Sequence, residues 1–598
     1  MGASIAGCAA ISSSLLAEHE FGGVLIIAFG PLAVALSVFL SETIYAGIAA
    51  PLPWSEGERE WLARASSIHI RRALIWAGVI ATPVLGSKLV FYLLGHQLVS
   101  APTLTLGTGL AGFLTSLVGK ARQAADSFEG SVKTIRRLSL TTIATILTPL
   151  VLFATLSLLA ALVEEIVFLG SAPLTGLKLP APEPNAQQAE AYSAIVTRGA
   201  WLSATSSAVA FLLSYFTDIN AFSLHALYRN RLARAFLGAS NAQRSPNPLT
   251  GFDERDNLSM SSLWPNGRGE ENRIPPQFHV VNVAMDVVAT TELVWQERKA
   301  MPFVFTPLHA GSGQMRGARG AYRAASQYGS GVEPPQSSAD SGLSLGTAIT
   351  ISGAAASPNM GYRSVPAMAL LMTMFNVRLG AWKGNPAEAG EHTFWRRGPL
   401  LSAKPLIYEA LGKTEEDRPY VYLSDGGHFE NLAVYEMIRR RCRLILVSDA
   451  GCDPHFRFED LGNALRKISI DLKVTIAFSG IPLKSRGDAD SSTPYHCVAK
   501  IRYSDDPEED GLLLYVKPTF RGDEPPAVLA YALAHDQFPH ESTANQFFGE
   551  AQFEAYRALG EHVIGEIART SGSGDGSVRS FIEAAIRTKQ STLEGIAS

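Results

Sequence analysis

The sequence predicts an α-helical transmembrane region followed by an α/β domain with a mostly parallel sheet. Apolar residues crowd into the first third of the 598-residue chain. After about residue 221, strand-like runs alternate with amphipathic stretches, as is typical of an α/β domain. The pattern strand, turn, helix, strand across 420–447 is a βαβ unit, which predicts parallel strands.

Four or five apolar segments are long enough to cross a bilayer, for which a helix needs roughly 20 residues. They lie near 22–49, 73–98, 102–119, 139–169 and 199–217. Basic residues gather between the first and second segments, between the third and fourth, and after the last. The positive-inside rule then predicts a multi-pass protein of the bacterial inner membrane whose C-terminal domain is cytoplasmic. The number of crossings stays open, because the first and third segments are also candidates for re-entrant or flat helices.

Composition excludes some classes of protein. Hydrophobic residues make up 47% and charged residues 18% of the chain, and the formal net charge is -4. Without a basic excess, no nucleic-acid partner is expected. None of the four cysteines forms a CxxC pair, so neither a zinc site nor a disulfide framework is indicated.

The expected elements of the second half follow in order. The runs 278–283 and 303–305 are predicted strands, and the Gly- and Ser-rich stretch 309–345 is predicted to be a loop. The run 420–423 is a short strand that leads into Asp425, and 431–441 is a helix followed by a strand over 444–447. Segments 497–503 and 511–518 suggest an antiparallel addition near the sheet edge.

The segment Ser424-Asp425-Gly426-Gly427-His428-Phe429-Glu430-Asn431 is the strongest candidate site. An Asp at the carboxyl end of a strand lies where α/β proteins place their sites, and glycines let the backbone turn sharply. His428 is a candidate for assisting proton transfer or for the rim of the site. Without further context, Asp-Gly-Gly is more often a simple turn.

Two segments together resemble the patatin and cytosolic phospholipase superfamily. The run from Thr347 to Pro358 is similar to its A-x-x-x-S-x-A-x-P segment, and Asp425–Asn431 to its D-G-[GA] turn and following Asn. Bacterial membrane-anchored patatin-like proteins share further runs, such as 228–232 and 538–543. The resemblance covers roughly residues 215–560 and implies a three-layer hydrolase domain.

The resemblance also implies the chemistry. Asp425 is then the general base of a Ser–Asp dyad that hydrolyses a phospholipid or lysophospholipid in a bilayer. Gly426, Gly427, His428 and Asn431 form the supporting loop, and no cofactor or metal is required. The oligomeric state stays open.

The nucleophile is the open question. Gly2-Ala3-Ser4-Ile5-Ala6 is the nearest elbow of the G-x-S-x-G type, which makes Ser4 a candidate. A second alignment places the nucleophile at the position of Met1, with the oxyanion loop upstream. Residues 1–21 are accordingly expected to be the remnant of an N-terminal hydrolase portion. The transmembrane region then spans 22–220, the patatin-like domain 221–570 and a C-terminal tail 571–598. The alternative is a non-catalytic membrane scaffold that retains the hydrolase fold.

Other polar residues allow two interpretations each. Asp449, Asp453 and His455 are either metal ligands or, as we favour, part of a strand followed by an Asp-Pro turn. Arg363 and Arg378 either meet a phosphate head group or are surface or salt-bridged residues.

Overall fold

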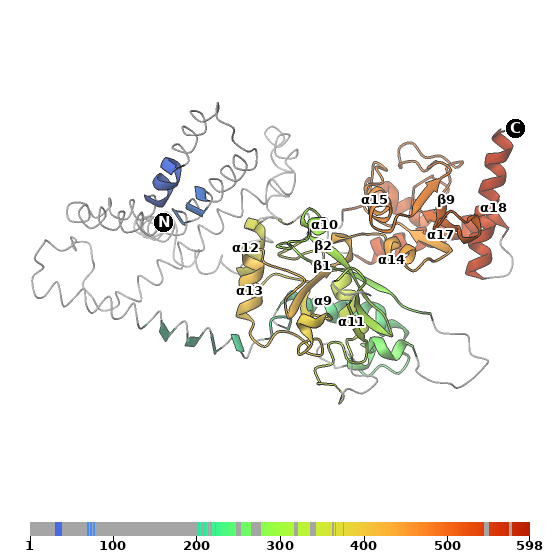
Figure 1. Ribbon diagram of the computed structural model, residues 1–598. Coiled ribbons are helices and arrows are strands. Elements are labelled where there is room, and N and C mark those ends of the chain that lie inside the picture. The colour runs from blue at the N-terminus through green and yellow to red at the C-terminus, as the bar shows by residue number, and fades with distance from the viewer. Residues whose placement is uncertain are drawn as a thin grey trace, which may run out of the picture. The chain divides into compact units, whose positions relative to one another are not determined.

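The computed structural model describes short stretches between residues 30 and 215 and most of 218–597 (Figure 1). The gaps in the second part are 222, 247–252, 265–276, 316–320, 335, 337–341, 362–363, 365, 375, 543–548 and 573–576. The chain divides into two compact units, Met1–Phe216 and Thr217–Ser598. All the elements described below belong to the second unit.

A six-stranded sheet forms the first layer of this unit. Its order is β4-β3-β2-β1-β6-β5, each neighbouring pair is antiparallel, and the sheet curls into a half-barrel. Strand β6 has two tyrosines and a valine among its six residues, which suits a buried pleated surface. The strands are β1 Val281–Asp286, β2 Ala300–Phe305, β3 His309–Ser312, β4 Ala321–Ala324, β5 Ala381–Gly384 and β6 Tyr420–Asp425.

A four-stranded sheet follows in sequence. Its order is β7-β10-β9-β8, with β10 parallel to β7 and antiparallel to β9. The antiparallel strands predicted over 497–503 and 511–518 are confirmed, but they form the middle of a separate sheet and not an addition at the edge of the first. The strands are β7 Leu444–Ser448, β8 Thr475–Phe478, β9 His496–Arg502 and β10 Gly511–Val516.

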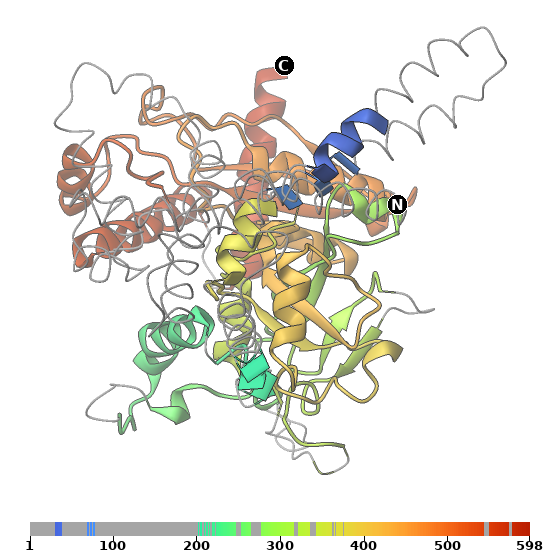
Figure 2. The same cartoon turned by 90° about the vertical axis from the view of Figure 1, so that its left-hand side faces the viewer.

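Helices join and cover the sheets. In Figure 1, α9 and α11 lie side by side next to the first sheet, and α11 contacts both β1 and β6. Helices α17 and α18, red in Figures 1 and 2, pack against one another, and α18 contacts β7, β9 and β10. The helices are α9 Leu224–Leu232, α10 Leu293–Gln296, α11 Leu345–Ser352, α12 Pro366–Met374, α13 Ala403–Ala410, α14 Val434–Arg439, α15 Glu459–Leu472, α16 Pro526–Ala534, α17 Glu550–Ser571 and α18 Val578–Ala597.

Short 3-10 and π turns complete the unit. They are η1 Ala233–Leu237, which is a π turn, and η2 Gly238–Ser240, η3 Glu254–Asp256, η4 Met260–Leu263, η5 Glu388–Gly390, η6 Gly426–His428 and η7 Pro507–Glu509.

The predicted fold class is wrong in its sheet. Strand β6 has β1 on one side and β5 on the other, both antiparallel, so neither edge is left for β7. The helix that follows β6 therefore leads to the second sheet, where β7 pairs in parallel with β10. The strands of the expected βαβ unit are both present, but they belong to different sheets, and the domain is built on antiparallel rather than three-layer parallel sheet.

Among the residues that the structure describes, no helix has the length and apolar character needed to cross a bilayer. This finding departs from the predicted transmembrane region, whose segments lie largely outside the described residues. Ser4 and the predicted remnant over 1–21 also lie outside them.

Candidate functional site at the end of strand β6

Asp425 ends β6, an interior strand of the first sheet. Residues Val421 to Ser424 are buried, because β6 has a strand on each side. Asp425 pairs with Val283 of β1 and is the first residue of the run to be only half-buried. The Asp425 carboxyl group therefore lies where the buried strand reaches the surface of the domain.

Two glycines form the turn that follows, η6. The Gly427 N–H donates to Asp425 Oδ1 over 2.7 Å. A Cβ at Gly427 would lie 3.0 Å from that same oxygen and 2.7 Å from Asn431 Oδ1, and a Cβ at Gly426 would lie 2.8 Å from the Asn282 carbonyl oxygen. Both positions therefore need glycine because of close approach, and Gly427 leaves room for the carboxyl group.

The Asp425 carboxyl binds its proton more strongly than an ordinary aspartate does. Burial raises its pKa from 3.8 to about 6, and the hydrogen bond from Gly427 acts in the opposite direction. A pKa this close to neutrality lets a carboxyl group both accept and release a proton under physiological conditions. This is the property that a general base needs.

Two side chains that the sequence did not single out as site residues flank Asp425. Tyr228 of α9 has a raised pKa, first through burial and then through the negative charge of Asp425. Its hydroxyl would lie 2.9 Å from a Cβ at Gly353. Ser352, the last residue of α11, lies beside Gly426, and its Oγ donates to the Asn282 carbonyl over 2.7 Å. Both residues fell within runs quoted for the family resemblance, which was the available signal.

A buried network lies beneath the turn. Ser424 Oγ donates to Asp286 Oδ2 over 2.7 Å and lies 2.8 Å from His428 Nδ1. All three residues are buried, and burial raises the pKa of Asp286 well above its usual value. Because Ser424 precedes Asp425 and His428 closes the turn, these bonds fix the strand end and the turn together.

This network is not a serine-hydrolase triad, although it contains Ser, His and Asp. In a triad the histidine stands between the other two, and the serine is open to the substrate. Here the Ser424 hydroxyl stands in the middle and is completely buried. The role of His428 in proton transfer stays a prediction; its Nδ1 faces Ser424.

The remaining predicted loop residue is Asn431. Its side chain is exposed, and Nδ2 donates to Asp460 Oδ2 of α15 over 2.8 Å. Its Oδ1 lies on the side of Gly427. The structure therefore gathers Asp425, Gly426, Gly427, His428 and Asn431 in one turn.

For the polar residues that allowed two interpretations in the sequence, the structure shows the following partners. Asp449 pairs with Lys517 at 3.0 Å, both side chains being almost wholly buried. No group of three potential metal-ligating side chains occurs in the described part of the chain. Arg378 is buried and pairs with Glu409 at 2.7 Å, so it is salt-bridged and does not face a head group. Arg363 is outside the described residues.

Scans of the chain against known protein families and against curated proteins give no match. The resemblance to patatin-type hydrolases therefore stays a prediction. The class that fold and site define together is an antiparallel β-sheet protein with a half-buried, proton-accepting aspartate at a glycine turn.

Proposed function

We propose that this protein hydrolyses an acyl ester of a phospholipid or lysophospholipid, with Asp425 as the general base. The observation that carries this proposal is the half-buried Asp425 carboxyl group, whose pKa burial raises to about 6. The resemblance of its turn to the patatin-type motif supplies the substrate class. The parallel sheet of that family is not part of what we propose.

The reaction balances with a serine nucleophile. The serine oxygen attacks the ester carbonyl carbon while Asp425 takes the hydroxyl proton. The carbon–oxygen bond to the leaving alcohol then breaks, and that alcohol receives the proton. Water next attacks the acyl-serine, again giving up a proton to Asp425, and the fatty acid leaves while the serine hydroxyl is restored. Ser4 is the candidate nucleophile within this chain, and the alternative alignment places the nucleophile at the position of Met1.

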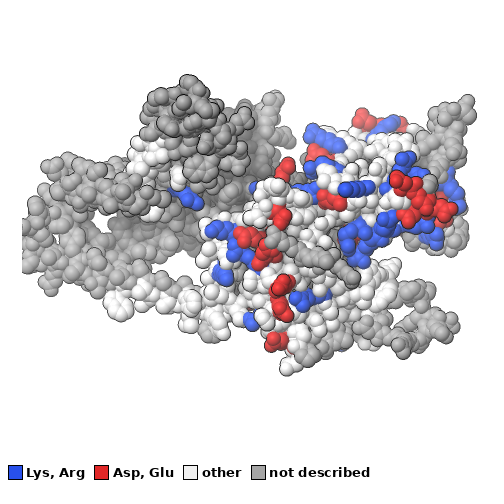
Figure 3. Space-filling view, in the orientation of Figure 1, with Lys and Arg blue, Asp and Glu red and all other residues white. Residues whose placement is uncertain are grey.

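The surroundings of Asp425 support the role of base. Gly426 and Gly427 carry no side chains that would cover the carboxyl group, and their positions tolerate none. The buried bonds of Ser424 hold the strand end in place, so the carboxyl group is pre-positioned. The surface visible in Figure 3 has basic and acidic side chains interspersed, rather than one broad basic face.

The test is hydrolysis of a fluorogenic lysophospholipid by the full chain in detergent. Asp425→Asn is expected to lower kcat by about 10²–10⁴-fold, the usual contribution of a general base. Asp505→Asn is the matched control, since this aspartate is exposed in the loop after β9. Full activity in Asp425→Asn would exclude Asp425 as the base.

The nucleophile is identified separately. A fluorophosphonate probe should label the chain at Ser4, and Ser4→Ala should abolish the label. Label at another serine would keep the reaction but move the nucleophile. Folded protein with neither label nor hydrolysis would contradict the proposed activity and favour a non-catalytic membrane scaffold.

The predicted location belongs to the same proposal. A lipid substrate is most accessible to an enzyme held at the bilayer, and the apolar segments of the first third are the reason to expect it there. Expressed in a bacterium, the chain should stay in the inner-membrane fraction after alkaline carbonate extraction. Recovery in the supernatant would contradict this location.

A further inference from the structure

A cavity of about 380 Å³ brings three basic side chains together away from Asp425. Arg229 comes from α9, Lys383 from β5, and Arg397 from the segment between β5 and α13. Burial lowers the pKa of Lys383 to about 8; Asp218 raises it, and the charges of Arg229 and Arg397 lower it further. Lys383 is therefore close enough to each arginine for their charges to repel.

One carboxylate, that of Asp218, only partly balances these cations: burial lowers the pKa of Lys383 and of Arg229, and the charge of Asp218 raises both without a direct ion pair. Asp218 is the one carboxylate among the described residues that line the cavity, and its Oδ1 accepts backbone N–H groups of residues 220 and 221 at 2.8 and 3.2 Å. Lys383 Nζ donates to the Arg397 carbonyl over 2.9 Å, and the Arg229 guanidinium donates to the amide oxygen of Asn230 at 3.3 and 3.4 Å. Within the described chain, none of the three forms an ion pair.

The first turn of α11 also lines the cavity. Ser344 caps this helix, its Oγ accepting the Thr347 N–H, and both residues line the cavity. The start of a helix carries partial positive charge and favours anions. His225, which also lines the cavity, is neutral at physiological pH because burial lowers its pKa to about 4.

We propose that this cavity is a binding site for a phosphate-type dianion. Three cationic side chains against one carboxylate leave an excess of two positive charges, which a dianion would balance. Two of the cations are arginines, whose forked donors suit phosphate oxygens. The hydroxyl groups of Ser344 and Thr347 add short polar contacts at the helix start.

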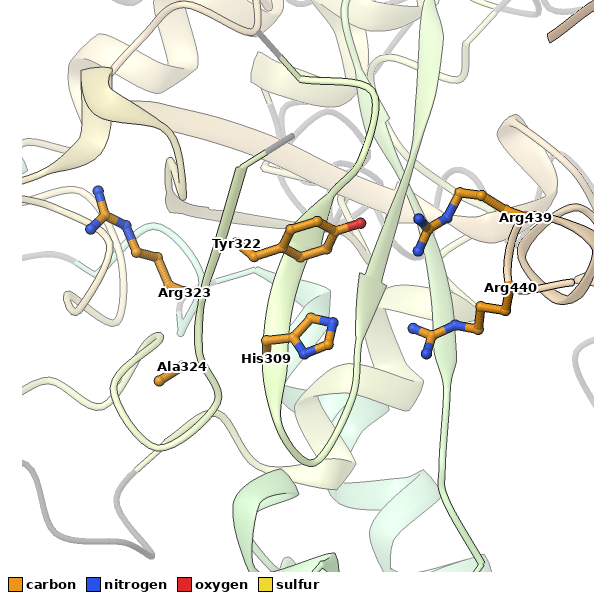
Figure 4. A pocket seen from close by; sticks show the side chains of 6 residues that line it. All are labelled: His309, Tyr322, Arg323, Ala324, Arg439 and Arg440. Carbon is orange, nitrogen blue, oxygen red and sulfur yellow. The ribbon is translucent and has the colours of Figure 1, made fainter. Parts of the chain in front are cut away.

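A second basic cavity is a weaker candidate. Figure 4 shows His309 and Tyr322 on neighbouring strands facing Arg439, the last residue of α14, and Arg440, which follows it, in a cavity of about 530 Å³. Both arginines already bind Glu436, at 2.7 Å each. Glu436 therefore partly neutralises Arg439 and Arg440. Within the described chain, no ion pair neutralises Arg229, Lys383 or Arg397.

The proposed anion site shares two helices with the Asp425 site. In α9, Arg229 lines the cavity while the preceding Tyr228 lies near Asp425. In α11, Thr347 lines the cavity while Ser352 lies beside Gly426. Thr347 and Ser352 are five positions apart on α11, which corresponds to about 7.5 Å of axial rise along the helix. The phosphate can thus belong to a lipid head group or to a free phosphate, and the experiment separates these sources.

The test is equilibrium binding by the full chain in detergent, measured by calorimetry without turnover. The ligands are inorganic phosphate, lysophosphatidic acid and a monoacylglycerol with the same acyl chain. Arg397→Gln is the main variant, because this exposed side chain forms no ion pair within the described chain. Arg229→Gln is the second variant, and Arg502→Gln on β9, likewise exposed, is the matched control.

We expect saturable phosphate binding that Arg397→Gln and Arg229→Gln each weaken by about tenfold or more, the usual effect of losing one charge-assisted bond. Arg502→Gln and Asp425→Asn should bind like the wild-type protein, which separates this site from the proposed hydrolysis. Tighter binding of lysophosphatidic acid than of phosphate, with none of monoacylglycerol, would identify a lipid head group. Equal affinity for the two phosphates would identify a free phosphate. No saturable binding of either, or binding unchanged in both variants, would overturn the proposal.

Discussion

Replacing Asp425 by Asn should stabilise the folded protein at neutral pH. The two side chains have nearly the same shape, and the Asn oxygen can still accept the Gly427 N–H that now reaches Asp425 Oδ1 at 2.7 Å. What the substitution removes is the cost of keeping a half-buried carboxyl group ionised. That cost is visible in the pKa of Asp425, which burial raises to about 6.

The magnitude follows from the linkage between protonation and folding. The folded state binds its proton below about pH 6, whereas the unfolded chain releases it near 3.8. Between these values the folded state holds more protons, so the free energy of unfolding falls as pH rises through this window. Above about pH 6 the full penalty applies, which amounts to at most ~3 kcal/mol. Partial exposure of the carboxyl group makes the measured value smaller.

Urea denaturation of the wild-type protein and of Asp425→Asn at pH 4 and pH 8 checks this expectation. The two proteins should be about equally stable at the lower pH, and the Asp425→Asn variant should be the more stable of the two at the higher pH. Asp505→Asn, an exposed control, should show no such change with pH. A wild-type protein that is the more stable at pH 8, or a difference independent of pH, would refute the proposed environment of Asp425.

Three further predictions concern the same turn and the core below it. The rate of ester hydrolysis should rise with pH and level off above about 6, because the Asp425 base must be ionised; a flat profile between pH 5 and 8 would contradict this. Gly427→Ala should lower kcat at least about tenfold, since its Cβ would press on Asp425 Oδ1, and stopped-flow turnover at fixed pH measures it. Glu409→Gln should destabilise the fold in urea denaturation, because it leaves the buried Arg378 without its anion. The loss should be smaller than the ~3–5 kcal/mol typical of a broken buried pair, because burial raises the pKa of Glu409 to about 7 and its ionisation is already costly; no loss at pH 8 would mean that water reaches the arginine.

The local elements were more predictable than their pairing. The runs that became β6, α14 and β7 are visible in the sequence, because hydrophobic periodicity reports burial along the chain. Their arrangement was predicted wrongly because the pattern strand, helix, strand does not state which sheet the second strand joins. That choice depends on β1 and β5, distant in sequence, which occupy both sides of β6.

The candidate site was accessible to sequence reasoning only in part. Asp425 and its two glycines are contiguous, so a motif could single them out. Asp286 lies 138 residues from Ser424, and only folding brings its carboxyl group under the turn. The basic cavity is equally non-local: Arg229, Lys383 and Arg397 stand in three separate segments with no shared spacing.

The larger hydrophobic core draws on both sheets, from Val283 and Phe303 of the first to Ala499 and Tyr515 of the second. Arg298 also reaches Asp471 of α15 with two bonds of 2.7 and 2.9 Å. The chain passes from the first sheet to the second only once, through α14 between β6 and β7. Because the core is shared, the two sheets are nevertheless not separable folding units. Residues 218–597 should unfold in one cooperative transition. If the chain is cut in the connection between α14 and β7, between Arg441 and Arg443, the two fragments should regain structure only when they are mixed.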